Sequence, residues 1–184
     1  MSALEFAQWI QSTGWASYLR MSAYIYPTIL ASHLTGIALF AGAVLVTDLR
    51  LLGVVMRNQP VSDVVNQLRW PKRIGFLIVA TCGFLLASSK AEEYYYNTFF
   101  RIKLTLLVLV AVHALVFRGS VYNNAAALDQ ARRMPRNAKL AAALSLLLWI
   151  SIACVGRGIG YIEPPLDKLH AALRDAAATV ATLR

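Results

Sequence analysis

Two histidines, His33 and His113, interrupt long apolar segments of this sequence, at 30–36 and 109–115. An ionisable side chain at membrane depth is costly and marks a functional site by default. If both segments are helices that enter from the same side, His33 lies about 15 Å and His113 about 18 Å below that surface. Two imidazoles at one level, on helices that face each other in a bundle, could bind one haem iron from both sides. The spacing therefore predicts His33 and His113 as axial ligands of a haem b.

Other residues near the histidines fit a flat, acidic cofactor. Gly36 follows His33 by three residues and leaves room for a ring, as do the alanines that flank His113. Basic side chains near the same ends of their helices could neutralise haem propionates. The predicted cofactor-binding residues are His33, His113, Gly36, Arg101, Lys103 and Arg157.

Simpler interpretations compete with this one. An intramembrane histidine can serve only as a hydrogen-bonding group between helices, and Thr81 and Ser145 are available as partners. A metal or proton path is another interpretation, although the methionines that copper sites use lie away from both histidines. Lys103 could simply extend its ammonium to the interface, and Asp48 with Arg50 could form an interfacial ion pair. The sequence shows no catalytic constellation.

The elements that would position these residues are membrane helices. The chain of 184 residues is 58% hydrophobic and 15% charged, whereas soluble domains carry about 25% charge. Uncharged blocks cover residues 21–47, 74–89, 104–117 and 140–156. The first is long enough to cross a bilayer with tilt, and the others fall short of the usual length of about 20 residues. We predict an all-α integral membrane four-helix bundle over residues 21–162.

Two amphipathic segments flank the predicted bundle. Residues 1–20 begin with a capping box, Ser2 and Glu5, and predict a helix that lies in the membrane interface. Residues 163–184 carry apolar side chains at heptad spacing. This C-terminal tail could rest on its own membrane surface, or it could dock a membrane-protein partner or a second copy of the chain.

The positive charges predict an orientation. The net charge is +9, and ten of the 18 basic residues lie between the first and second or the third and fourth blocks. Basic loops stay in the cytoplasm, so both termini are predicted outside a bacterial inner membrane. We also expect short helices within these loops, one after Pro60 that ends at Trp70-Pro71 and one over 121–133. Nucleic-acid binding is excluded because no basic motif with interleaved aromatic residues occurs.

Three segments resemble a bacterial family of small four-helix membrane proteins of unknown function. They are 33–53, 101–104 and 156–161, and the resemblance covers about residues 20–162. That family is similar to the CopD-like and membrane protoporphyrinogen-oxidase-like group. The resemblance implies that His33 and Lys103 match a first-helix histidine and a third-helix lysine associated with haem b, and that His113 matches a further polar position of the third helix. The aromatic-rich first-helix motif of the oxidase is missing here, so its reaction is not implied.

The sequence thus predicts a cytochrome b-like protein that binds haem b between helices one and three for electron transfer, with a quinone or a membrane protein as redox partner. An electron-transfer or accessory subunit is favoured over a stand-alone enzyme. The alternatives are a non-catalytic structural subunit of a larger membrane complex, a protoporphyrinogen-oxidase-like enzyme and a copper-transport protein.

The predicted orientation can be tested by cysteine labelling. A membrane-impermeant thiol reagent added outside should label Leu173→Cys in the tail but not Arg133→Cys in the second basic loop, because basic loops remain on the cytoplasmic side. Labelling of the loop position alone would reverse the topology.

Overall fold

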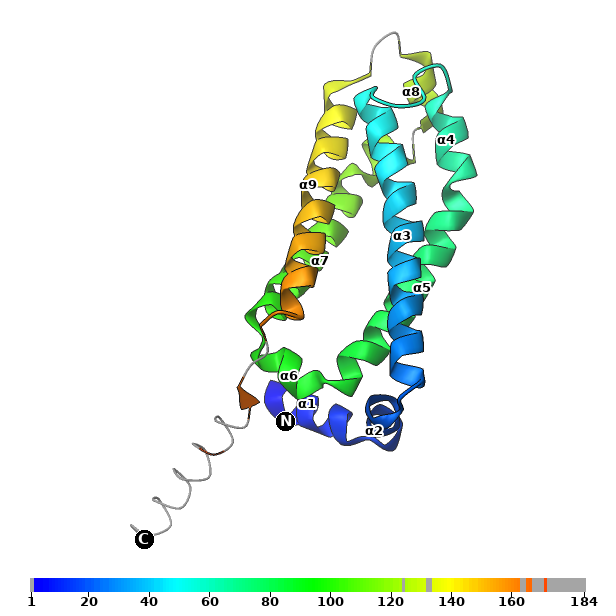
Figure 1. Cartoon of the computed structure of the whole chain (residues 1–184). Helices are drawn as coiled ribbons and strands as arrows, with labels where there is room; N and C mark the ends of the chain where they lie inside the picture. Colours follow the sequence, from blue (N-terminus) through cyan, green and yellow to red (C-terminus); the bar gives the residue numbers. More distant parts are fainter. Residues whose placement is uncertain (1, 124, 132–133, 163–164, 167–170, 172–184) are drawn as a thin grey trace, which may run out of the picture.

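The chain forms a helical membrane bundle in a computed structural model that describes residues 2–123, 125–131, 134–162, 165–166 and 171. Within these residues the structure is helical and contains no strand. Four of the described helices are long and apolar enough to cross a membrane (Figure 1). They are α3 (Ile25–Leu52), α5 (Arg69–Ser89), α7 (Thr98–Phe117) and α9 (Arg136–Ile159). This confirms the predicted all-α fold and defines a multi-pass membrane protein.

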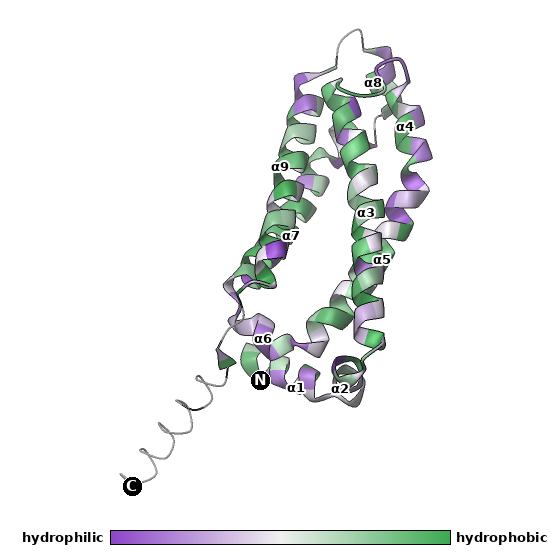
Figure 2. Ribbon diagram, viewed as in Figure 1, coloured by the Kyte–Doolittle hydropathy of each residue, from purple (hydrophilic) through white to green (hydrophobic). Residues whose placement is uncertain are grey.

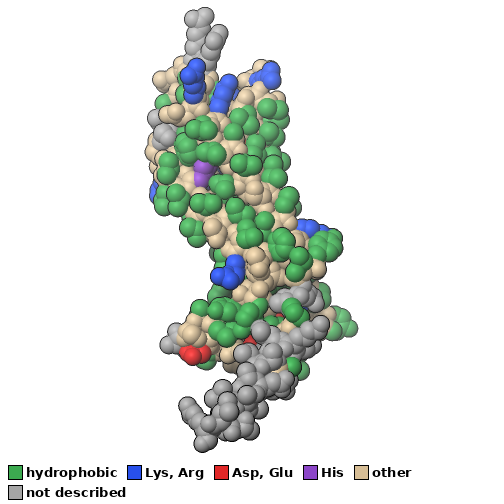
Figure 3. Space-filling model, turned by 90° about the vertical axis from the view of Figure 1, so that its left-hand side faces the viewer, with side chains coloured by type: hydrophobic (Ala, Val, Ile, Leu, Met, Phe, Trp, Pro, Cys, Tyr) green, Lys and Arg blue, Asp and Glu red, His purple; other side chains and the backbone are tan. Residues whose placement is uncertain are grey.

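The spans are longer than the uncharged blocks of the sequence because each takes in charged residues at its ends. For example, α5 begins at Arg69 and includes Lys72 and Arg73 before its apolar stretch. Long basic side chains can lie along apolar surface while the charge reaches the interface. Hydrophobic residues dominate the long helices in Figure 2, and they cover much of the face seen in Figure 3. The bundle therefore presents its apolar side chains to lipid.

The long helices pair unequally. α3 packs against α5 and also against α9, and α7 packs against α9. Among these described helices, α7 has no comparable packing against α3 or α5. Figure 1 shows that the α3–α5 and α7–α9 pairs diverge toward the end where the chain begins. α9 is therefore the helix that joins the two halves of the bundle.

Glycines bring α3 and α5 close together. A Cβ at Gly36 of α3 would lie 2.7 Å from a methyl group of Ile78, and a Cβ at Gly75 of α5 would lie 2.8 Å from the backbone nitrogen of Phe40. Small residues serve this purpose in membrane helices, where close packing replaces the hydrophobic effect as the driving force. The close contact between α3 and α5, called here the α3–α5 seam, thus depends on a glycine in each helix.

Three short helices close the amino-terminal end of the bundle. α1 (Ala3–Ser12) carries the predicted capping box, and α2 (Gly14–Met21) follows after a break at Thr13. The expected single helix is thus two helices. Glu92 of α6 (Ala91–Tyr96) accepts a hydrogen bond from Gln8, and its backbone N–H donates to Gln11. Large aromatic side chains of α1 and α2 remain exposed, as expected for helices at a membrane interface.

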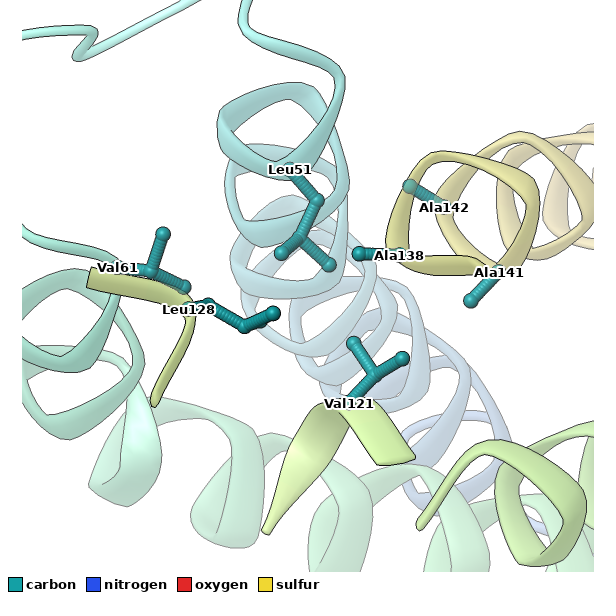
Figure 4. Close-up of a cluster of buried hydrophobic side chains, with 7 residues drawn as sticks. All are labelled: Leu51, Val61, Val121, Leu128, Ala138, Ala141 and Ala142. Carbon is teal, nitrogen blue, oxygen red and sulfur yellow. The ribbon is translucent and has the colours of Figure 1, made fainter. Parts of the chain in front are cut away.

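The opposite end is built from α4 (Val61–Gln67), the π-helical turn η1 (Arg118–Tyr122) and α8 (Ala125–Gln130). The predicted helix over 121–133 is therefore wrong as a continuous element. Pro71 also does not end a helix, because it lies in the first turn of α5. Proline is tolerated there, since the backbone N–H groups of a first turn have no partner within the helix. Figure 4 shows side chains from these elements and from α3 and α9 meeting in one buried cluster, which comprises Leu51, Val61, Val121, Leu128, Ala138, Ala141 and Ala142.

The predicted heptad pattern of the C-terminal tail falls almost wholly outside the described residues. Docking through this tail to a partner or a second copy therefore remains a prediction.

The glycine seam can be tested by adding one methyl group. Gly75→Ala should lower stability by about 1–3 kcal/mol, because the new Cβ meets the Phe40 backbone. This corresponds to a fall of roughly 2–12 °C in the apparent melting temperature in detergent. Gly42→Ala on α3 is the matched control, since a Cβ there has nothing within 4 Å. Equal melting temperatures for the two variants would contradict the close approach.

Candidate functional site

His33 is buried between α3 and α5. Only 9% of the residue is exposed, and a Cβ at Gly83 of α5 would lie 3.0 Å from Cε1 of its ring. The backbone of Val79, one turn earlier on α5, interacts with the same ring. Nδ1 of His33 is buried and has no hydrogen-bond partner within the described part of the chain. An unpaired polar atom of this kind costs about 1–3 kcal/mol, so it calls for an explanation.

Lys103 of α7 lies on the opposite side of the same half of the bundle. It is partly buried, and its Nζ would be 3.9 Å from a Cβ at Gly156 of α9. Its charge acts on His33 across the space between the helix pairs. Among the residues that the structure describes, no hydrogen bond or ion pair to this ammonium is found. His33 and Lys103 therefore interact electrostatically, and Nδ1 of His33 is the buried atom that lacks a hydrogen-bond partner.

Gly36 does not leave room for a ring in the way the sequence suggested. Because Gly36 has no side chain, α3 packs closely against Ile78 and Val79 of α5 at this position. The glycines beside the two polar groups are instead Gly83 and Gly156. Sequence reasoning missed both because each is distant in the chain from the residue that it approaches.

The two arginines of the predicted set are both exposed. Arg101 is exposed on α7. Arg157 is exposed on α9, where its guanidinium donates a hydrogen bond of 2.9 Å to the hydroxyl of Tyr161 and lies 5.0 Å from the centre of that ring. Arg157 is thus engaged at the end of its own helix.

His113 has a different environment from His33. Its Nε2 lies 2.9 Å from the backbone oxygen of Ala141 on α9, so this nitrogen is the donor, and its ring contacts Phe117. The partner is a backbone carbonyl rather than the Thr81 or Ser145 hydroxyl considered from the sequence. His113 therefore serves as a hydrogen-bonding group between α7 and α9, as the simpler interpretation expects.

The structure does not bring His33 and His113 together. His113 bonds to Ala141, which lies in one buried cluster with Leu51, and Leu51 is eighteen residues, about 27 Å, further along α3 than His33. The expected equal depth is wrong, because the two histidines contact different helices at different heights. A metal–imidazole bond is only about 2 Å long, so one iron cannot reach both rings in this arrangement.

A second buried polar centre surrounds Asp48, which the sequence suggested only as a member of an interfacial ion pair. This residue is 1% exposed, its side chain bonds with that of Ser145 on α9, and it interacts electrostatically with Lys72 on α5. Its Oδ2 has no partner among the described residues. Arg50, the expected ion-pair partner, instead donates to the backbone oxygen of Gln59 at 2.9 Å. The expected interfacial ion pair is therefore wrong; only the polarity of Asp48 within an apolar helix could have signalled its burial.

Within the described residues, no group of three or more His, Cys, Asp or Glu side chains could hold a metal ion. The His33 region thus offers one imidazole and one amine. This donor set is too small for a metal ion that depends on protein ligands alone, since such sites normally use three or four.

Comparison with known proteins identifies a family but no characterised relative. The chain belongs to a family of unknown function, DUF6644, which matches residues 6–162. No curated protein and no solved structure matches the chain. The expected resemblance to small four-helix membrane proteins, and their wider likeness to CopD-like and protoporphyrinogen-oxidase-like proteins, stays a prediction.

The Asp48 centre yields a stability test. Ser145→Ala removes the hydroxyl that bonds with the buried carboxylate, and it should destabilise the protein by about 1–3 kcal/mol. Ser151→Ala on the same helix is the control, because that exposed hydroxyl only donates to the Leu147 carbonyl of its own helix. In thermal unfolding in detergent, Ser145→Ala should melt at a lower temperature than Ser151→Ala. Equal melting temperatures would mean that the bond between Asp48 and Ser145 does not contribute to stability.

Proposed function

We propose that this protein is a membrane b-type cytochrome-like protein that holds haem b in the half of the bundle next to its amino-terminal end. The observation that carries the proposal is the buried, unpaired Nδ1 of His33, together with the electrostatic interaction between this ring and Lys103 of α7. One ligand with a metal centre and a carboxylate would satisfy both groups.

The donor set favours haem over a bare metal ion. The haem macrocycle supplies the equatorial nitrogens, so the protein needs to provide only one or two axial ligands. His33 supplies one such ligand. The Val79 backbone interacts with the ring and would help to orient it, a role that the second hydrogen bond of a ligating histidine usually has. The fit therefore requires no further His, Cys, Asp or Glu side chain.

Lys103 has a separate role in this proposal. Its ammonium would pair with a propionate carboxylate, and a charge-assisted hydrogen bond at a partly buried position is stronger than a neutral one. Because Gly83 has no side chain, the His33 ring can lie against α5, and Gly156 of α9 likewise leaves space next to the Lys103 ammonium. When bound, the haem supplies one-electron redox chemistry; the chain's own residues bind it, orient it and keep it in apolar surroundings.

The site lies about 12 Å along α3 from Ile25, the first residue of the helix. With both termini outside a bacterial inner membrane, the redox partner would approach the outer surface. A quinone or a membrane protein at that surface is the proposed partner, and the exposed aromatic side chains of α1 and α2 lie at the same end.

A structural subunit of a larger membrane complex is the second candidate. The bond from His113 to the Ala141 carbonyl favours it, because this bond joins α7 to α9 within the bundle. Enzymatic and copper-transport roles gain no support from the described residues.

Absorption spectroscopy tests the proposal. After expression with added haem, the purified wild type should show a Soret band, and His33→Ala should lose it because the axial ligand is gone. His113→Ala is the matched histidine control and should keep the band, since this ring bonds a helix backbone instead. Lys103→Met should reduce haem retention, whereas Arg101→Met should not.

A wild type without a Soret band would reject haem binding. Loss of the band in His113→Ala but not in His33→Ala would reject the proposed ligand. Circular dichroism of each variant distinguishes loss of haem from loss of the fold.

A further inference from the structure

A pocket opens at the end of the bundle opposite to the His33 region. Its volume is about 940 Å³, within the range of small-ligand sites. The described lining combines three basic side chains with polar loop residues and an apolar part. The basic side chains are Arg50, Arg57 and Lys139, and the apolar ones include Leu52, Leu128 and Met134.

The two arginines are held in place by the loop that forms the pocket wall. Arg50 donates to the backbone oxygen of Gln59, and Nε of Arg57 donates to the backbone oxygen of Gly53. The same loop holds Met56 at a φ of 51°, a left-handed conformation that is uncommon for a residue with a side chain. Neither arginine forms an ion pair with a carboxylate among the described residues, so each keeps N–H donors for a ligand.

Asp129 is the one acidic residue in the described lining, and its carboxylate is already engaged. It accepts hydrogen bonds from the backbone N–H groups of Val61 and Ser62. Although burial opposes ionisation, bonds from Ser62 and Val61 and the nearby Arg50 hold the pKa of Asp129 below its usual range. The pocket therefore has a net positive charge, because three basic side chains face one carboxylate that is already hydrogen-bonded.

The position of the pocket indicates the source of its ligand. Leu52 is the last residue of α3, and Lys139 lies in the first turn of α9, so the pocket is at the level where two spans end. Lipid headgroups lie at this level, and basic pockets between spans bind anionic headgroups. An apolar part beside the cations suits the glycerol and the first acyl carbons of a lipid better than a free ion.

We propose that this pocket binds the phosphate-bearing headgroup of an anionic phospholipid. Arg57 and Lys139 provide the charge that recognises the phosphate, and Leu52, Leu128 and Met134 contact the apolar part of the lipid. This site is independent of haem binding because it lies at the other end of the bundle.

Lipid titration of the full-length protein in a mild detergent tests the assignment. Phosphatidylglycerol should raise the apparent melting temperature, and phosphatidylcholine with the same acyl chains should not, since it has no net charge. Lys139→Gln should weaken phosphatidylglycerol binding about fivefold, and adding Arg57→Gln should weaken it by a further factor of about five.

Arg136→Gln is the matched control, because it removes one positive charge a single turn away on α9, outside the pocket. It should change binding by less than about twofold. An equal loss in Arg136→Gln and Lys139→Gln would mean diffuse surface charge and would overturn the site. Equal effects of the two lipids would overturn it as well.

Inorganic phosphate separates a lipid from a free anion. Millimolar phosphate should leave the melting temperature unchanged. If it stabilises the wild type as well as phosphatidylglycerol does, and Lys139→Gln removes that effect, the pocket binds a free phosphate group and the lipid assignment is wrong. Lys139 is exposed, so its variant should fold, which the melting temperature without lipid verifies.

Discussion

Close approach of α3 and α5 is the contact on which the rest of the bundle depends. In hydrocarbon, apolar side chains gain little by leaving lipid, so helices associate through close packing and polar contacts. Gly36 and Gly75 provide that packing from opposite sides of the seam, and Gly83 extends it toward the amino-terminal end. Because the His33 ring fills the space beside Gly83, the seam also fixes the orientation of the imidazole. The site is thus a consequence of helix packing rather than of a local motif.

The buried polar groups of the bundle are satisfied to different degrees. His113 donates to a backbone carbonyl of α9, and Asp48 shares a bond with Ser145. Nδ1 of His33 has no such partner in the described structure, and neither has Oδ2 of Asp48. Lys103, which interacts electrostatically with His33, forms no hydrogen bond or ion pair with the described residues. Since leaving a polar group unpaired in an apolar environment is expensive, the pair of His33 and Lys103, and not the satisfied histidine, is where a bound group would have the largest effect. This difference separates two residues that look equivalent in the sequence.

The sequence predicted the fold well because the bilayer constrains it strongly. A spanning segment must satisfy its own backbone, so long apolar blocks identify the four helices even when three blocks are short. The capping box at Ser2 was equally readable, since it depends on neighbours three residues apart. The depth of His113 in the bundle could not be predicted from the sequence. An estimate that counts residues from each helix start assumes that the helices begin at one level, but α7 takes its position from α9 and not from α3. The burial of Asp48 likewise depends on a residue almost a hundred positions later.

The location of the proposed cofactor limits what kind of electron transfer it could serve. His33 lies about 12 Å from the start of α3, whereas nineteen residues, about 28 Å, separate it from the end of that helix at Leu52. A pair of histidines on one iron at mid-membrane would have been compatible with transfer in either direction. A single ligand in one half is closer to one surface, so exchange at the amino-terminal surface fits it better than passage across the whole bilayer. The opposite end, with its buried Asp48 centre and its basic pocket, would then anchor the bundle in the other leaflet without taking part in redox chemistry.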